Sequence, residues 1–278
     1  MIFEYFDGAP GVIKAHTEGT ATDVLALIDQ QPLGYAKKFN LAPSDAKGNA
    51  AVDLEVSLPM VRDLPLEKLR IGVQAKTTDL SVPIDARRRL EKAQVSFAVS
   101  TTSLTSQGTG VISGAPVTFK WTEDFTSNGN STRVEVASRV DDTTRPALGL
   151  AQPLWLTGTI PATAVFTGRR FHFTEAQVKA DLTSAVMELP VLQTRKEAGT
   201  QASGSGTVLF LEGGAMNVQD LVMTSAPILM RGGLQLDASG NVSTISLSQL
   251  RAGEGNEFAV NITPMQGGGY DIRMRGKV

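Results

Sequence analysis

The chain has 278 residues, with 26 Lys plus Arg against 28 Asp plus Glu and a formal net charge of −2. Such a balance gives no general attraction for nucleic acid, so we expect no nucleic-acid partner. Cysteine is absent, which excludes disulfides, thiolate metal sites and cysteine nucleophiles. Glycine is frequent, at 27 residues, and this suits a fold of many turns and bent strands.

The N-terminal region predicts one or two short strands within residues 2–20, followed by a short helix. The hydroxyl of Thr20 or Thr22 can cap a helix that starts near Asp23 and ends near Gln31, before Pro32. We expect this helix to cap one end of a sheet. The first residues lack the basic region and apolar run of a signal peptide, and no stretch of about 18 apolar residues occurs. The chain is therefore either cytosolic or a piece of a longer exported protein.

From Gly48 onward the apolar residues recur with a period of two, which is the period of a β-strand. The segments 52–58, 71–75, 95–99 and 117–121 each alternate apolar with polar residues. Gly108, Gly110 and Gly114 interrupt a further short strand, where glycine permits bulges and bends. The sequence thus predicts antiparallel strands with one apolar and one polar face.

The C-terminal half repeats the same pattern after two interruptions. Residues 142–153 contain prolines and a glycine and are the best candidate for a loop or seam. Residues 194–206 are polar and glycine-rich and predict a mobile turn or the start of a bent strand. With average strand lengths, the chain predicts about 14 strands in all. The C-terminal ones are expected at 208–212, 216–223, 228–237, 242–250, 257–263 and 270–275.

Two architectures satisfy this alternation. In a β-sandwich, two sheets pack their apolar faces together into a dry core. In an open groove, a single bent sheet keeps its apolar face accessible to a ligand. Periodicity alone favours the sandwich.

Several stretches carry a resemblance to a known family: ADLTSAVMELPVLQTRKEAG (180–199), GSGTVLFLEGGAMNVQDLVM, GGLQLDASGNVSTISLSQLRAGEGNEFAV and GGGYDIRMRGK. Their order resembles the AsmA-like bacterial envelope proteins, in particular the YhdP/TamB type with its repeating β-groove. The likeness covers about residues 20–278 and is carried by strand rhythm rather than by invariant chemistry.

This resemblance implies a mainly β fold, in which a long curved antiparallel sheet forms a hydrophobic groove over a single elongated region, 1–278. It further implies a soluble fragment of a lipid-transfer protein of the bacterial periplasm. Phospholipid acyl chains would be the cargo. The full-length protein would be attached to the inner membrane through an anchor missing from this chain, with other envelope proteins as possible partners. The alternative is a structural or ligand-binding β-sandwich domain.

Such a carrier works passively, so we expect no catalytic residue, metal or cofactor. The residues expected to line the groove are apolar positions of the alternating strands. They are Leu54, Val56, Val73, Val95, Phe97, Val99, Val117, Phe119, Trp121, Phe171 and Phe173.

Each polar motif can be explained by a structural or surface role as well as by a functional site. The only histidines, His16 and His172, are isolated, which favours packing or surface roles over a metal site. The acidic pairs Glu123-Asp124 and Asp141-Asp142 predict solvated turns rather than glycosidase carboxylates. The arginine run 87–89 and the pair 169–170 also predict solvated turns, with phosphate head groups at the groove's rim as the alternative.

Overall fold

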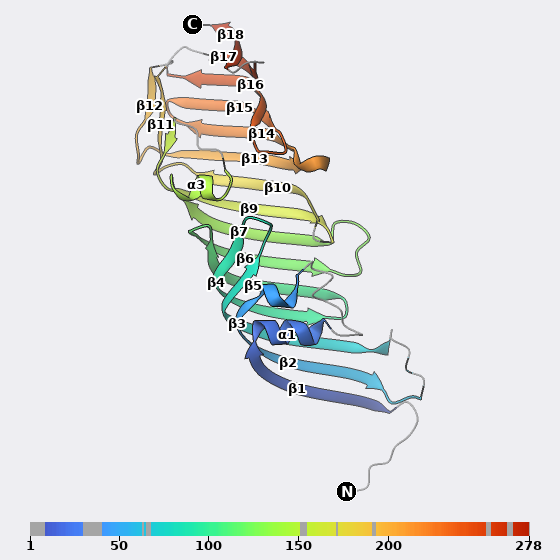
Figure 1. Cartoon of the computed structure of the whole chain (residues 1–278). Coiled ribbons are helices and arrows are strands. Elements are labelled where there is room, and N and C mark those ends of the chain that lie inside the picture. Colours follow the sequence, from blue (N-terminus) through green and yellow to red (C-terminus); the bar gives the residue numbers. More distant parts are fainter. Residues whose placement is uncertain are drawn as a thin grey trace. The chain divides into compact units, whose positions relative to one another are not determined.

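The computed structural model describes residues 9–29, 41–62, 64, 68–150, 155–170, 172–190, 193–253, 257–265 and 269–277. Within these ranges the chain is mainly β, as the sequence predicts. Figure 1 shows the strands following one another as an antiparallel meander. The fifteen strands of the large sheet are ordered β1-β2-β3-β4-β5-β6-β7-β9-β10-β13-β14-β15-β16-β17-β18, and a second sheet has the order β12-β11-β8.

The bounds of the strands in the N-terminal part are β1 Pro10–Thr20, β2 Lys47–Pro59, β3 Arg70–Pro83, β4 Arg89–Ser100, β5 Ser103–Ile112, β6 Ala115–Asp124 and β7 Thr132–Val140. The later strands are β8 Leu156–Thr157, β9 Ile160–Arg169, β10 His172–Asp181, β11 Val186–Leu189, β12 Thr194–Lys196, β13 Ala202–Phe210, β14 Met216–Ser225, β15 Ile228–Leu236, β16 Val242–Ala252, β17 Glu257–Pro264 and β18 Tyr270–Lys277. The helical segments are α1 Ala21–Ile28, α3 Thr144–Ala147, and the 3-10 turns η1 Pro43–Asp45 and η4 Glu212–Gly214.

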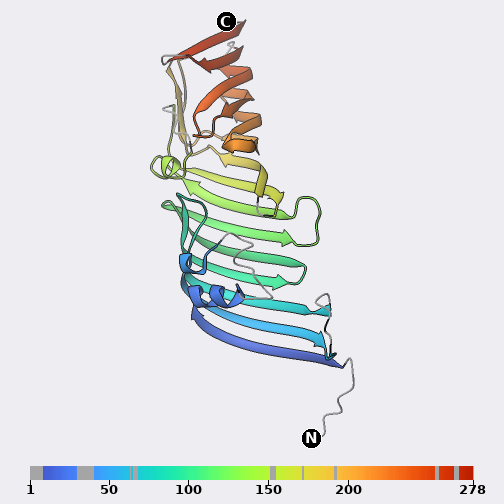
Figure 2. The same cartoon turned by 45° about the vertical axis from the view of Figure 1, so that its right-hand side comes forward.

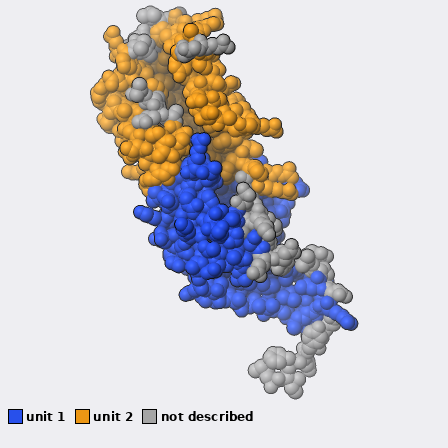
Figure 3. Space-filling model, in the orientation of Figure 1, with its two compact units in different colours: residues 1–112, 118–134 blue, residues 113–117, 135–278 orange. Residues whose placement is uncertain are grey.

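The chain divides into two compact units (Figure 3). Unit 1 comprises residues 1–112 and 118–134, and unit 2 comprises residues 113–117 and 135–278. The seam expected at 142–153 stays a prediction. Of that segment, 151–153 lie outside the described residues, and the rest contains α3.

In unit 1 the alternating sequence gives the sheet two different faces. Leu54 of β2 pairs with Val73 of β3, which pairs in turn with Val99 of β4. The neighbouring positions, such as Asp53 opposite Gln74, point to the other side. An apolar face and a polar face therefore run through β2, β3 and β4.

The predicted helix is α1, beside the edge strand β1 and β2. Thr20 caps it, because its hydroxyl oxygen accepts a hydrogen bond from the backbone N–H of Asp23 at 3.1 Å. Ala21, Ala46 and Ala50 are all buried, so the helix and η1 close this end of the apolar face. Residues 30 and 31, included in the predicted helix, lie outside the described residues.

Unit 2 repeats the two-faced design over β9, β10 and β13–β18. Its apolar face is followed by register from strand to strand: Val208 pairs with Val218, Val218 with Leu234, Leu234 with Ile245, and Ile245 with Ile262. The opposite face carries mostly polar side chains. On this face, Gln177 of β10 lies opposite Thr207 of β13, and Thr207 lies opposite Gln219 of β14.

A line of register shifts crosses unit 2 from β13 to β17. Four successive strand pairs shift, between Ser205 and Thr207, Val218 and Leu221, Arg231 and Gly232, and Leu247 and Leu250. A bulge adds a residue to one strand and bends it. A Cβ at Gly233 would lie 2.5 Å from the carbonyl oxygen of Val218, so the close approach of β15 to β14 requires glycine there. We call the line of four register shifts the bulge line.

The three-stranded sheet packs on the apolar face on one side of the bulge line. Figures 1 and 2 show β11 and β12 standing upright across the ends of the strands of the large sheet in unit 2. Met187 of β11 and Ile228 of β15 are 0% exposed in the shared core. We call the large-sheet residues of this core the covered part of the apolar face; they include Ala180, Ala202, Met223, Ile228 and Met230.

A fully buried lysine fixes the chain around the small sheet. Lys196 of β12 is 1% exposed, and its Nζ donates to the carbonyl oxygens of Ala185 at 2.7 Å, Leu182 at 2.8 Å and Thr183 at 3.0 Å. Burial lowers the pKa of this ammonium, and nearby Asp181 opposes that shift. The segment 194–206, predicted as a turn or the start of a bent strand, thus contains a short strand, β12, and the start of β13.

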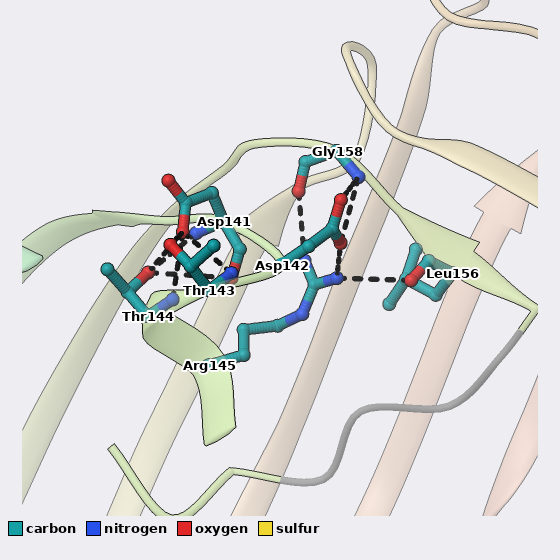
Figure 4. Close-up of polar contacts among 7 residues, drawn as sticks. All are labelled: Asp141, Asp142, Thr143, Thr144, Arg145, Leu156 and Gly158. Carbon is teal, nitrogen blue, oxygen red and sulfur yellow. Dashed lines mark hydrogen bonds and ion pairs between the residues drawn. The ribbon is translucent and has the colours of Figure 1, made fainter. Parts of the chain in front are cut away.

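A cluster of hydrogen bonds and an ion pair, which we call the clasp, joins α3 to β8 (Figure 4). Arg145 is 4% exposed; its Nη1 donates to the carbonyl of Gly158 at 2.9 Å and its Nη2 to the carbonyl of Leu156 at 3.1 Å. Nη2 also pairs with the Asp142 carboxylate, which accepts from the N–H of Gly158 at 3.0 Å. The acidic pair 141–142 is therefore structural, because Asp141 in turn caps the segment that carries Arg145.

Candidate functional site

The candidate site is the apolar face of the large sheet, described separately in each unit. In unit 1 the structure brings the predicted residues of β2, β3 and β4 together on one face. Leu54, Val73 and Val99 form one row, and Phe97 follows in the next row, opposite Ala75. These four side chains are half-buried, whereas Val95 nearby is 3% exposed. Val56 lies on the same face, opposite Ile71.

The predicted residues on β6 fall on one side of that strand but in two units. Val117 belongs to unit 2 and is 6% exposed, while Phe119 and Trp121 belong to unit 1 and are half-buried. Glu123 follows in the same alternation and is 3% exposed, so the prediction that the pair 123–124 forms a solvated turn is wrong for Glu123. Period two places it on the side of the aromatic residues. Only Asp124 is exposed, and it binds Thr126.

Phe173 lies in unit 2, at the start of β10, and is 39% exposed. It contacts Phe166 of β9 with a ring-centroid distance of 5.4 Å, and Phe166 stacks near Phe210 of β13 at 6.3 Å. This aromatic group sits on the apolar face, beyond the bulge line from the small sheet. Phe171 lies outside the described residues.

A second set of accessible apolar residues in unit 2 lies on segments that the sequence predicts as strands, without marking them as a site. On the far side of the bulge line from the small sheet, most apolar residues of β13–β18 remain half-buried or exposed; Val260 of β17, opposite Leu247 beside the line, is buried at 6%. The sequence signal for these residues is the alternation of apolar and polar residues before and after a turn that contains glycine, as in Leu234–Leu236 before the turn at 237–241. We call these residues the open part of the apolar face: Val208, Phe210, Met216, Val218, Leu234, Leu236, Ile245, Ile262 and Ile272.

The open part differs from the covered part in its surroundings. None of its residues belongs to the buried core formed with the small sheet, among the residues that the structure describes. Ile272 is 57% exposed, against 0% for Ile228 on the same face. In the space-filling view unit 2 is hollowed between its two sides (Figure 3). The open part is therefore the region of unit 2 where apolar side chains of the large sheet lie outside the packed core.

The dimensions suit a lipid tail. Four or five residues per strand span roughly 15 Å, at about 3.4 Å per residue. One leaflet of a bilayer has a hydrocarbon thickness of about 15 Å, half of the roughly 30 Å core. Each methylene shielded from water contributes about 0.8 kcal/mol, so many weak contacts can hold a chain without fixing it.

The opposite face has a different chemistry in each unit. In unit 1 it carries ion pairs: Lys14 with Glu55 at 3.2 Å, and His16 with Asp53 at 2.7 Å. The hydrogen bond that the His16 ring donates to the Asp53 carboxylate raises the pKa of His16. In unit 2 it has a depression of 270 Å³, whose lining includes the polar residues Gln235 and Thr244 and the acidic residue Asp220. Both arrangements suit contact with water rather than with acyl chains.

The two histidines and the arginine pair are placed at the surface. His16 and His172 are both exposed. His172 pairs with Arg169 at the β9–β10 turn, and Arg170 lies in that turn. In the arginine run, Arg88 binds the Asp85 carboxylate within its own turn at 2.7 Å. These positions fit surface roles, and contact with phosphate stays a hypothesis.

Comparison with protein-family models, curated proteins and solved structures found no match to this chain. No helix in the described ranges has the length and apolar character needed to cross a bilayer.

Proposed function

We propose that this chain is a segment of an envelope lipid-transfer protein that shields phospholipid acyl chains on an apolar sheet face. The observation that carries the proposal is the open part of unit 2. There, apolar side chains from six successive strands lie in register on one face and outside the buried core. A globular protein that needs only stability buries such residues.

The mechanism follows from the contrast between the faces. Acyl chains would lie on the apolar face, while the polar head group stays in water at its border. Sliding costs little, because a methylene that leaves one apolar side chain meets a similar side chain on the next strand. Transport between inner and outer membranes, a periplasmic location and an inner-membrane anchor outside this chain belong to the same proposal and rest on the AsmA-like resemblance.

A second candidate is a structural or ligand-binding β-domain without lipid transport. The covered part favours it, because the small sheet and the large sheet pack there into a dry core in the manner of a sandwich. The two candidates differ in what contacts the open part: lipid in one case and only water or protein in the other.

Site-specific photo-crosslinking in cells, in the full-length protein, separates them. The probe is placed in turn at two neighbouring pairs of positions, Phe119 and Lys120 in unit 1, and Leu234 and Gln235 in unit 2. Each pair points to opposite faces of its strand. The proposal expects phospholipid to be captured at Phe119 and Leu234 and not at their polar neighbours. Capture at none of the four, with all variants folded and abundant, favours the structural domain.

A further inference from the structure

At one end of the unit 2 strands, successive turns carry exposed apolar side chains. The register places the β9–β10, β13–β14, β15–β16 and β17–β18 turns at the same end of the sheet. Three of these four turns have large apolar residues in them or beside them. We call these residues the turn edge: Phe173 is 39% exposed, Leu211 49%, Met265 54% and Tyr270 60%.

Among the described residues, those at the opposite ends of β14, β15 and β16 are buried. Ser225 and Ile228, on either side of the β14–β15 turn, are 6% and 0% exposed, and Ala252 at the end of β16 is 0% exposed. The small sheet accounts for this burial, because Ile228 belongs to its core. Among the described turn residues of these strands, the large exposed apolar side chains thus lie at one end.

The charges along the turn edge offset one another. Arg169 and Arg170 lie at the β9–β10 turn, Glu212 at the β13–β14 turn and Asp237 at the β15–β16 turn. The Asp237 carboxylate is occupied by the N–H groups of its own turn, at 2.9 Å from Ser239 and from Asn241. A partner of high charge is therefore not selected here, whereas an apolar or amphiphilic one is.

The spacing of the exposed residues distinguishes a bilayer from a protein partner. Neighbouring hairpins of one sheet are about 10 Å apart, and the polar β15–β16 turn separates Leu211 from Met265. A stable protein interface needs a continuous patch of about 800 Å² on each partner. A bilayer accepts separate side chains one by one, and an amphipathic tyrosine suits its interface.

We propose that the turn edge docks on the surface of a lipid bilayer and admits acyl chains sideways onto the open part. This inference rests on the proposed function. The aromatic group supplies the path, because Phe173 of the turn edge contacts Phe166, which lies beside Phe210 of the open part. A chain leaving the bilayer over this end meets apolar side chains continuously.

The test is flotation of the whole chain with phosphatidylcholine vesicles, with and without phosphatidylglycerol. The test variant combines Leu211→Asp and Met265→Asp. The control is Leu150→Asp, because Leu150 is 51% exposed but follows α3 instead of lying at the turn edge; its N–H donates to the carbonyl oxygen of Arg145 at 2.9 Å. We expect the wild type to float with both vesicles, the double variant to bind at least about tenfold more weakly, and the control to change less than twofold. A second double variant with Gln at both sites should lose binding too.

Three results would overturn docking through the turn edge: no flotation of the wild type, equal losses in the test and control variants, or binding that needs phosphatidylglycerol and disappears in high salt. The proposed function is followed separately, through uptake of a monomeric short-chain fluorescent phospholipid. Val208→Asp should abolish that uptake and leave flotation intact. Uptake retained in a chain that never floats would reject bilayer docking alone. Flotation without any uptake would reject lipid shielding instead.

Discussion

On both sides of the bulge line, the apolar face of unit 2 is built from the same kinds of residue, yet its two parts have different environments. The covered part packs against Met187 and its neighbours in the small sheet, and Ile228 there is fully buried. The open part carries Ile272 on the same face at 57% exposure. An alternating strand thus specifies an apolar face, but only tertiary packing decides whether that face becomes core or surface.

This comparison implies that one substitution has two outcomes. Ile228→Ala should lower the free energy of unfolding of unit 2 by about 3–4 kcal/mol, because it leaves a cavity in a dry core. Ile272→Ala should cost less than about 1 kcal/mol, because most of its side chain already contacts water. Chemical denaturation of both variants measures the difference. Equal losses would mean that the open part is also a packed core, and the comparison would fail.

The packing of the small sheet on the covered part of the apolar face depends on Lys196. Lys196→Met keeps the length of the side chain and removes the donor that binds the carbonyls of residues 182, 183 and 185, at a cost of about 2–3 kcal/mol. We expect faster amide hydrogen exchange at Ala185, whose N–H binds Leu182. The matched control is Lys179→Met on the exposed polar face of β10. Unchanged amide hydrogen exchange in both variants would show that the Lys196 ammonium does not hold the small sheet in place.

The smallest effect concerns the clasp at α3. Hydrogen bonds from Thr143 and Thr144 hold the pKa of Asp141 well below its usual range. The stability that the folded state gains from this carboxylate is therefore complete above the unfolded pKa of about 3.9 and is lost as the pH falls through the folded pKa. Asp141→Asn should flatten the loss of stability between about pH 4 and pH 2. An identical acid profile for wild type and variant would contradict this role.

The sequence predicts the strands well because alternation is a local signal. That Leu54, Val73 and Val99 each lie on the apolar side of their own strand follows from period two, as it does for Phe119 and Trp121, whereas the alignment of the first three in one row comes from the register. The capping of α1 is equally local, since Thr20 binds an N–H three residues away.

Other features depend on partners far along the chain. Lys196 lies in a polar, glycine-rich stretch that reads as a turn, and it becomes a buried strand residue only because carbonyls of residues 182–185 surround it. The bulge line is hidden for the same reason. Val218 and Leu221 are three residues apart, which breaks the alternation, and the pairing with β15 alone shows that both face one way. The open part was missed as a site because its boundary is this line.

The bulge line also bears on how this chain can change over generations. Each extra residue in a bulge resets the two-residue period, so that Leu247 and Leu250 share a face although they are three apart. Replacing a side chain beyond the line alters one position. Deleting one residue within 219–220 or 248–249 would turn the rest of that strand over and bring its polar side chains onto the apolar side. A point substitution should therefore be selected on the environment of its own position alone, while single-residue deletions at the line are selected against because they displace a whole strand face.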